Sequence, residues 1–231
     1  MKFLYILILI FTISLSAYES IELSQNKKDL SKEIYSKLEK DHFLKKKDKT
    51  DFNKKYIQAL IKKLDKDKNY FTITEINKFI EQSKFQGEED FNIELAYELI
   101  NLYFEKLIKF SKFQIELVEN DNFDFNKDEY LDIFSEDNQW VLTKSSLKEI
   151  WRLETKNDLL IAKTSDSSSS KPNEDLIKRY KNRVRRIGQQ KEEDIFSLAI
   201  NTLSNQFDPH SSYLSPRSAE DFDCLLYTSD A

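Results

Sequence analysis

Apolar residues recur at steps of three and four along most of this chain, and glycine is almost absent. The recurrence predicts amphipathic helices, because a residue three or four positions further on returns to the same face of a helix. Only two glycines, Gly87 and Gly188, occur in 231 residues. Tight hairpins and phosphate-binding loops need glycine for their positive φ angles, so a Rossmann fold, a P-loop fold or a β-barrel is not expected. The sequence therefore predicts an all-α fold.

The composition is that of a globular protein whose partners are proteins. Hydrophobic residues make up 39% of the chain, which is enough apolar material for a packed core and too much for a disordered chain. The 36 basic and 41 acidic residues are dispersed and give a net charge of -5. No large field of one sign points to a membrane surface or to nucleic acid. We therefore expect protein or peptide partners and no nucleic-acid partner.

Seven segments carry the helical spacing, and signals at some of their ends add detail. The segments are residues 30–38, 52–64, 72–80, 93–110, 146–153, 173–188 and 195–203. The segment 93–110 is predicted to form the longest helix. Thr72 with Glu75, and Ser146 with Glu149, have the spacing of a capping box, in which a hydroxyl and a carboxylate satisfy backbone donors reciprocally. Gly188 is expected to end its helix in the left-handed conformation.

Residues 1–17 have the pattern of a secretory signal peptide. Met1 and Lys2 precede an apolar run from Phe3 to Phe11, and small residues follow up to Ala17. A transmembrane anchor, the alternative, needs about 20 apolar residues, and this run becomes polar sooner. We predict export with cleavage near Ala17, and no stable membrane span after cleavage.

Two acidic stretches place oxygen ligands at alternate positions, as an EF-hand loop does. Residues 65–69 and 124–128 both lack the glycine and the glutamate that such a loop needs at its sixth and twelfth positions. Turns between helices explain them better than calcium sites. His42 and His210 are the only histidines and Cys224 is the only cysteine, so we expect no metal site and no cofactor.

Residues 207–217 contain the residue types of a hydrolase triad in one short run. Asp208, His210 and either Ser211 or Ser212 are near neighbours around Pro209. A triad requires its base to bridge nucleophile and acid in space, which adjacent residues around a proline turn do not readily do. We therefore predict that these residues form no hydrolase triad.

Six cations lie between residues 178 and 186, in a helix that carries its own apolar stripe. A solvated helix face is the favoured interpretation, and contacts to phosphate groups are the alternative.

Three segments resemble those of one protein family. Residues 207–217, Phe-Asp-Pro-His-Ser-Ser-Tyr-Leu-Ser-Pro-Arg, resemble the segment that leads into the PDZ module of tail-specific, C-terminal-processing proteases. Residues 64–71 resemble the family's Leu-Asp-Pro-Asp-x-x-Tyr-Phe element, with Lys66 where proline is common. Residues 123–125, Phe-Asp-Phe, together with Glu129, resemble a third element, and the order and spacing of the three agree with the family.

The resemblance covers roughly residues 28–223 and implies a division of the chain. The last eight residues instead resemble the translation of a sequencing adapter, so we expect no role for Cys224. The predicted parts are a signal peptide (1–17), a helical N-terminal domain of a tail-specific protease (18–206), a linker leading to a PDZ domain (207–223) and an adapter-like tail (224–231). The chain is thus expected to be truncated before the PDZ and protease domains.

The family implies a function for an intact parent. That parent would be a serine-type endopeptidase of a Gram-negative-type periplasm, either free or associated with the inner membrane. It would cut exported proteins from their free C-termini with a serine activated by a lysine. The serine and lysine are expected beyond Asp223, so the resemblance implies no catalytic residue in this chain, which is expected to be inactive. In the family the helical domain supports the protease and can contact an adaptor lipoprotein. The alternative is a noncatalytic, secreted helical interaction module.

Overall fold

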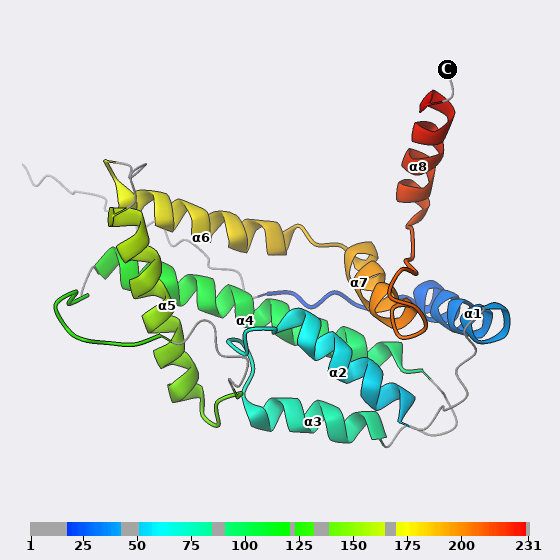
Figure 1. The fold of residues 1–231 in the computed structure, drawn as a ribbon, viewed down its shortest axis with the longest axis horizontal. Coiled ribbons are helices and arrows are strands. Elements are labelled where there is room, and N and C mark those ends of the chain that lie inside the picture. The colour runs from blue at the N-terminus through cyan, green and yellow to red at the C-terminus, as the bar shows by residue number, and fades with distance from the viewer. Residues whose placement is uncertain are drawn as a thin grey trace, which may run out of the picture.

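The computed structural model describes residues 18–42, 51–84, 91–120, 123–131, 139–164 and 170–229. These residues contain helices and no strand, which confirms the predicted all-α fold (Figure 1). The helices are α1 (Gln25–Asp41), α2 (Phe52–Leu64), α3 (Ile73–Lys84), α4 (Ile93–Asn120), α5 (Lys144–Thr164), α6 (Pro172–Gly188), α7 (Glu192–Ser204) and α8 (Pro216–Ser229). The predicted signal peptide, residues 1–17, lies outside the described residues.

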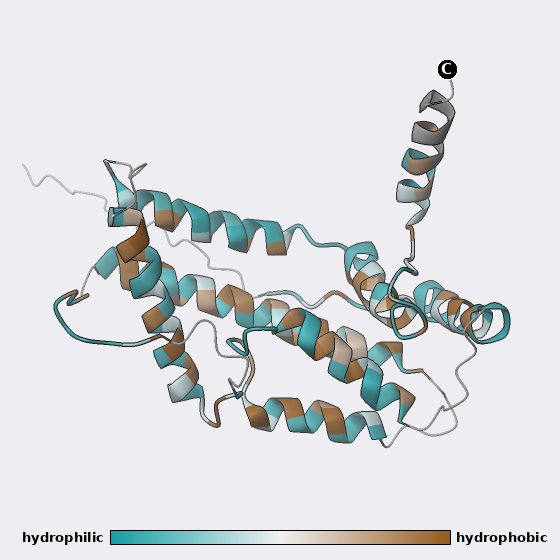
Figure 2. Ribbon diagram, viewed as in Figure 1, coloured by the Kyte–Doolittle hydropathy of each residue, from teal (hydrophilic) through white to brown (hydrophobic). Residues whose placement is uncertain are grey.

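Helix α4 is the centre of the fold. It has 28 residues and is the longest of the described helices, as the spacing predicts. Helices α1, α2, α3, α5, α6 and α7 all contact it. Figure 1 shows α6 running alongside α4, with α2 and α3 on the opposite side. Each of these helices has a hydrophobic stripe (Figure 2), and α4 gives those stripes a common surface on which to be buried.

The main hydrophobic core lies around the first half of α4. It joins α1, α2, α3 and α7 to that helix, and its fully buried side chains include Tyr56, Leu60, Phe71 and Phe196. Two smaller clusters lie further along α4, where α5 and α6 pack. Their buried members are Phe110, Leu147 and Trp151 in one, and Val118, Leu159, Leu176 and Tyr180 in the other.

One of the two predicted capping boxes is present and the other is wrong. The backbone N–H of Thr72 donates to Glu75 Oε2 at 2.9 Å, and the N–H of Glu75 donates back to Thr72 Oγ1 at 3.4 Å. Helix α5 begins earlier than predicted, because Thr143 rather than Ser146 caps it. The backbone N–H of Ser146 donates to Thr143 Oγ1 at 3.0 Å.

The predicted left-handed role of Gly188 is also wrong. Gly188 is the last residue of α6, and no glycine among the described residues has a positive φ. The capping residue is Gln189, which keeps a right-handed helical conformation, and its backbone N–H donates to the carbonyls of Arg186 and Ile187. The last turn of α6 is therefore tightened, and it provides hydrogen-bond donors for carbonyls at the helix end without a residue in the left-handed conformation.

Helix α8 stands apart from the rest of the molecule. It crosses the predicted boundary between residues 223 and 224, and within the described ranges it makes no contact with the other seven helices (Figure 1). Neither α8 nor any other described helix is long and apolar enough to cross a membrane.

Candidate functional site: a buried polar centre beside α4

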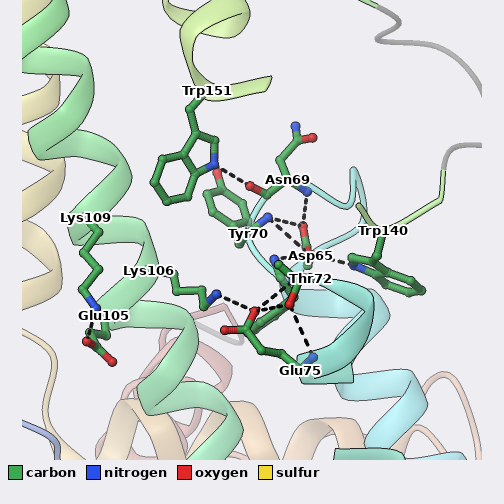
Figure 3. Close-up of polar contacts among 11 residues, drawn as sticks. Asp65, Asn69, Tyr70, Thr72, Glu75, Glu105, Lys106, Lys109, Trp140 and Trp151 are labelled. Atoms are coloured by element: carbon green, nitrogen blue, oxygen red, sulfur yellow. Dashed lines mark hydrogen bonds and ion pairs between the residues drawn. The ribbon is translucent and has the colours of Figure 1, made fainter. Parts of the chain in front are cut away.

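Asp65 follows α2 directly and organises the turn that leads into α3 (Figure 3). The residue is 1% exposed. Its carboxylate accepts backbone N–H bonds from Asn69 at 2.7 Å, Tyr70 at 3.2 Å and Phe71 at 3.1 Å. The indole N–H of Trp140 donates to the same carboxylate at 3.0 Å. Both oxygens are thus taken up by donors of the protein, which is the arrangement of a turn anchor.

Opposing influences act on the ionisation of Asp65. Burial raises the pKa of its carboxyl, while the indole donor and the three backbone donors act in the opposite direction. Burial disfavours the charged form, and hydrogen bonds to the carboxylate favour it. The four donors therefore offset much of the cost of placing an acid in this position.

Two tryptophans hold the turn from the α5 side of the molecule. Trp151 Nε1 donates to the backbone carbonyl of Asn69 at 2.6 Å, and Trp140 reaches Asp65 as described. The N–H of Ile73 donates to the carbonyl of Val141 at 2.9 Å, so the start of α3 is also bonded to the segment before α5. The turn is consequently fixed by residues that lie about 70 to 80 positions away in the chain.

A lysine and a glutamate link α4 to the start of α3. Lys106 Nζ lies 2.5 Å from Glu75 Oε2, and Lys106 is 8% exposed. Burial raises the pKa of Glu75, but the Lys106 ammonium and the Thr72 donors outweigh it and leave that pKa below its usual value. The carboxylate of Glu75 thus serves two elements, since it also closes the capping box with Thr72 (Figure 3).

Glu154 on α5 is an acid in a largely buried, polar environment. It accepts a hydrogen bond from the side-chain amide of Asn69. Burial, reinforced by the nearby Asp158 carboxylate, raises the pKa of Glu154 to about 7, and Arg183 opposes that shift. Local sequence patterns do not single out Glu154, because its burial depends on how α5 and the 65–72 turn pack together.

Arg183 brings α6 to the same centre. Its guanidinium donates to Gln114 Oε1 on α4 at 2.9 Å. It also lies over the rings of Phe110 and Tyr180, 5.6 and 5.4 Å from their centroids, which is cation–π distance. Four parts of the fold therefore meet at this polar centre: the 65–72 turn, α4, α5 and α6.

The third family-like segment is held by a separate set of charges. Glu129 lies 2.5 Å from Arg152 Nη2 and 2.6 Å from Lys156 Nζ, both on α5. Hydrogen bonds from Lys156 and Arg152 lower the pKa of Glu129 to about 2. The backbone N–H of Asn126 donates to Asp124 Oδ1 at 2.9 Å, so the acidic stretch at 124–128 contains a local turn.

The histidine that approaches Ser211 is not the one beside it in the sequence. Ser211 Oγ lies 3.4 Å from His42 Nε2 and 3.3 Å from Asp208 Oδ2, while His210 is exposed. In a triad the histidine lies between the hydroxyl and the acid, whereas here the hydroxyl lies between the histidine and the acid. The arrangement ties the end of α1 to the segment after α7.

The rest of that segment is also anchored. Phe207 is 7% exposed and packs against the rings of Tyr35 and Phe52. The N–H of Tyr213 donates to Asn201 Oδ1 at 2.7 Å, and its hydroxyl lies 3.2 Å from Glu193 Oε1. The segment therefore works as a fixed exit from the helical body.

Comparison with known proteins places these features in a family. Residues 34–217 match the model described as the tail specific protease N-terminal domain, and this range includes both the Asp65 turn and the 207–217 segment. The chain is also 27% identical over 203 residues to the tail-specific protease of Haemophilus influenzae. That alignment covers 87% of this chain but only 29% of the relative, so the chain spans less than a third of that protein's length. The chain belongs to the family of tail-specific protease N-terminal domains.

Proposed function

We propose that this chain is the N-terminal helical part of a periplasmic serine-type endopeptidase that processes or degrades exported proteins from their C-termini. Within that enzyme the helical body would act as a scaffold and as a docking domain, for which an adaptor lipoprotein is the proposed partner. The family match over residues 34–217 carries the proposal.

The fixed exit of the chain supports the scaffold role. Phe207 is buried against α1 and α2, and Tyr213 is bonded to α7. Any domain that continues from residue 217 would start from a defined point and direction. A support for a protease needs this property, because substrate capture and cleavage depend on how the domains are oriented.

The proposed chemistry assigns no role to the lysines described in this chain. A lysine that serves as general base must be neutral to accept a proton from the serine hydroxyl. Lys106 is the only buried lysine among the described residues, and it donates to the Glu75 carboxylate. A donor role is the opposite of what the base requires, so the proposed serine and lysine belong to a region beyond this helical body.

The source DNA downstream of the codon for Asp223 tests the proposal. We expect an open reading frame that encodes a PDZ module and a peptidase core with a serine and a lysine. The product of that frame should cleave a reporter protein with a free, apolar C-terminus and spare the same reporter with an amidated C-terminus. The 231-residue chain should cleave neither.

An in-frame stop codon directly after that position would contradict the proposal and favour the noncatalytic interaction module. Cleavage of the reporter by the 231-residue chain would contradict the assignment of chemistry to other domains. N-terminal sequencing of the exported protein checks the proposed location, with Tyr18 expected as the first residue of the mature form.

A further inference from the structure

The outward face of α6 carries cations that form no ion pair with the residues that the structure describes. Lys178, Arg185 and Arg186 are exposed, and their side chains make no hydrogen bond or ion pair with the described part of the chain. The other arginines of this helix behave differently. Arg179 is paired with Asp158, and Arg183 is bonded to Gln114.

The free cations lie along one side of the helix and form a surface. A shallow hollow on α6 is lined by Asp175, Lys178, Arg179, Asn182, Arg185 and Arg186. Lys178 and Arg185 are seven residues apart, which places their Cα atoms about 10 Å apart along the helix axis. In Figure 1 one side of α6 lies against α4 and no described helix lies on its other side, and Figure 2 colours most residues of this helix as hydrophilic.

Helix stability alone does not explain this surface. Cations in the last turn interact favourably with the helix dipole, which accounts for Arg185 and Arg186. Lys178 lies two turns earlier, where that interaction has fallen away. Like charges on one face also repel each other, so these cations lower the stability of the chain when no partner is bound.

We propose that this α6 surface, formed by Lys178, Asn182, Arg185 and Arg186, binds an acidic helical segment of a protein partner. Two helical turns separate Lys178 from Arg185, and the same spacing separates carboxylates at positions i and i+7 of a partner helix. The Asn182 amide lies between them and can donate to a third acidic group. Asp175, at the N-terminal end of the hollow, would favour a cation on the partner and so set its direction.

A membrane surface fits the α6 surface less well. Leu176, Tyr180 and Ile187 of α6 are buried in the protein, and Ile177 and Val184 are half-buried. No apolar side chain of this helix is therefore exposed for insertion into a bilayer. The inference rests on the proposed docking role and names the surface that would carry it.

Binding of a designed peptide tests the inference. The probe is a fluorescein-labelled, alanine-based helical peptide with glutamates at positions i, i+4 and i+7, and its counterpart has glutamines there. Fluorescence anisotropy measures binding to the chain, to the variant Lys178→Gln/Arg185→Gln/Arg186→Gln and to the control Lys37→Gln/Lys84→Gln/Lys109→Gln. The control removes the same charge from exposed lysines on α1, α3 and α4.

We expect the α6 variant to bind the glutamate peptide at least tenfold more weakly than the parent chain, and the control variant to lose less than twofold. Binding should weaken as salt is raised, because exposed charges are screened. The inference would be overturned if both variants lost the same affinity for the glutamate peptide. It would also be overturned if the parent chain bound the glutamine peptide as tightly as the glutamate peptide. Tighter α6-dependent binding to phosphatidylglycerol vesicles than to the peptide would likewise overturn it. These results are independent of the downstream DNA, so the surface can fail while the peptidase proposal stands.

Discussion

Asp65 joins the end of α2, the turn and Trp140 through a single carboxylate, so we expect its loss to be costly. Asp65→Ala removes the acceptor for four N–H groups and should lower the free energy of unfolding by about 3 kcal/mol or more. Asp65→Asn keeps one acceptor oxygen but turns an amide donor toward other donors, so it should cost about 1–3 kcal/mol. Urea denaturation measures both. Asp67→Asn, an exposed acid in the same turn, is the matched control, and a cost equal to that of Asp65→Asn would refute the anchor role.

Glu154 should make stability depend on pH between about 4.5 and 7. Its pKa in the folded protein, about 7, lies above the ordinary value of 4.5, so the folded state holds a proton that the unfolded state has lost. Stability must then fall as the pH rises through this window, by roughly 2–3 kcal/mol. A glutamine side chain at this position can still accept the hydrogen bond from Asn69 and has no charge to bury. In Glu154→Gln this part of the dependence of stability on pH should therefore disappear.

Urea denaturation of the parent chain and Glu154→Gln at pH 5 and pH 8 measures the effect. The variant should be more stable than the parent at pH 8, with a much smaller difference at pH 5. Glu116→Gln, an exposed glutamate on α4, serves as the control and should follow the parent at both values. If Glu154→Gln also follows the parent, the carboxyl is better solvated than its position indicates.

At the scale of elements, the Glu75–Lys106 pair should couple α3 to α4. Glu75→Gln leaves a buried ammonium without its carboxylate and should cost about 2–4 kcal/mol. Lys106→Met in the same protein removes that charge, so the double variant should be more stable than the sum of the two single changes indicates. A double-mutant cycle by urea denaturation should give a coupling above about 1 kcal/mol.

The exposed pair Glu105–Lys109 on α4 is the matched control for this cycle (Figure 3). Exposed pairs within one helix couple by only about 0.3–0.5 kcal/mol. Similar coupling energies in the two pairs would mean that burial does not strengthen the Glu75–Lys106 pair.

A helix or a cap can be predicted from the sequence when the residues that determine it lie within the same short segment. The seven predicted segments all form helices, because the apolar stripe of each lies within the segment itself. The Thr72–Glu75 cap was equally predictable, since both partners lie within one turn. The Ser146–Glu149 pair has the same spacing, but Thr143 offers an earlier hydroxyl and the helix begins there. Spacing alone does not decide between two such overlapping signals.

The polar centre could be predicted only in part. Its Asp65 turn was visible as an acidic element between two helices, although its donors were not. Trp140 and Trp151 reach the turn across 75 and 82 residues, and nothing in local spacing specifies such contacts. Local spacing likewise does not predict that His42 rather than His210 contacts Ser211, since His42 and Ser211 are 169 positions apart.

For the whole molecule, the buried contacts place the end of the folded body between Tyr213 and the start of α8. Phe207 belongs to the main core and Tyr213 is bonded to α7, while α8 makes no contact with the other helices in the described ranges. A chain that ends at Ser215 should therefore melt within about 1 °C of the full-length chain. A chain that ends at Gln206 loses a buried phenylalanine and the Tyr213 bonds, and should lose about 3 kcal/mol or more.

Circular dichroism at rising temperature measures both truncations, and a loss of 3 kcal/mol should lower the melting temperature by several degrees. The variant Phe207→Ala in the chain that ends at Ser215 separates packing from length. If Phe207 anchors the exit, this variant should account for most of the difference between the two truncated chains. A melting temperature that falls steadily with each residue removed would instead show that the exit is held by α8, and the scaffold role would then lose its structural basis.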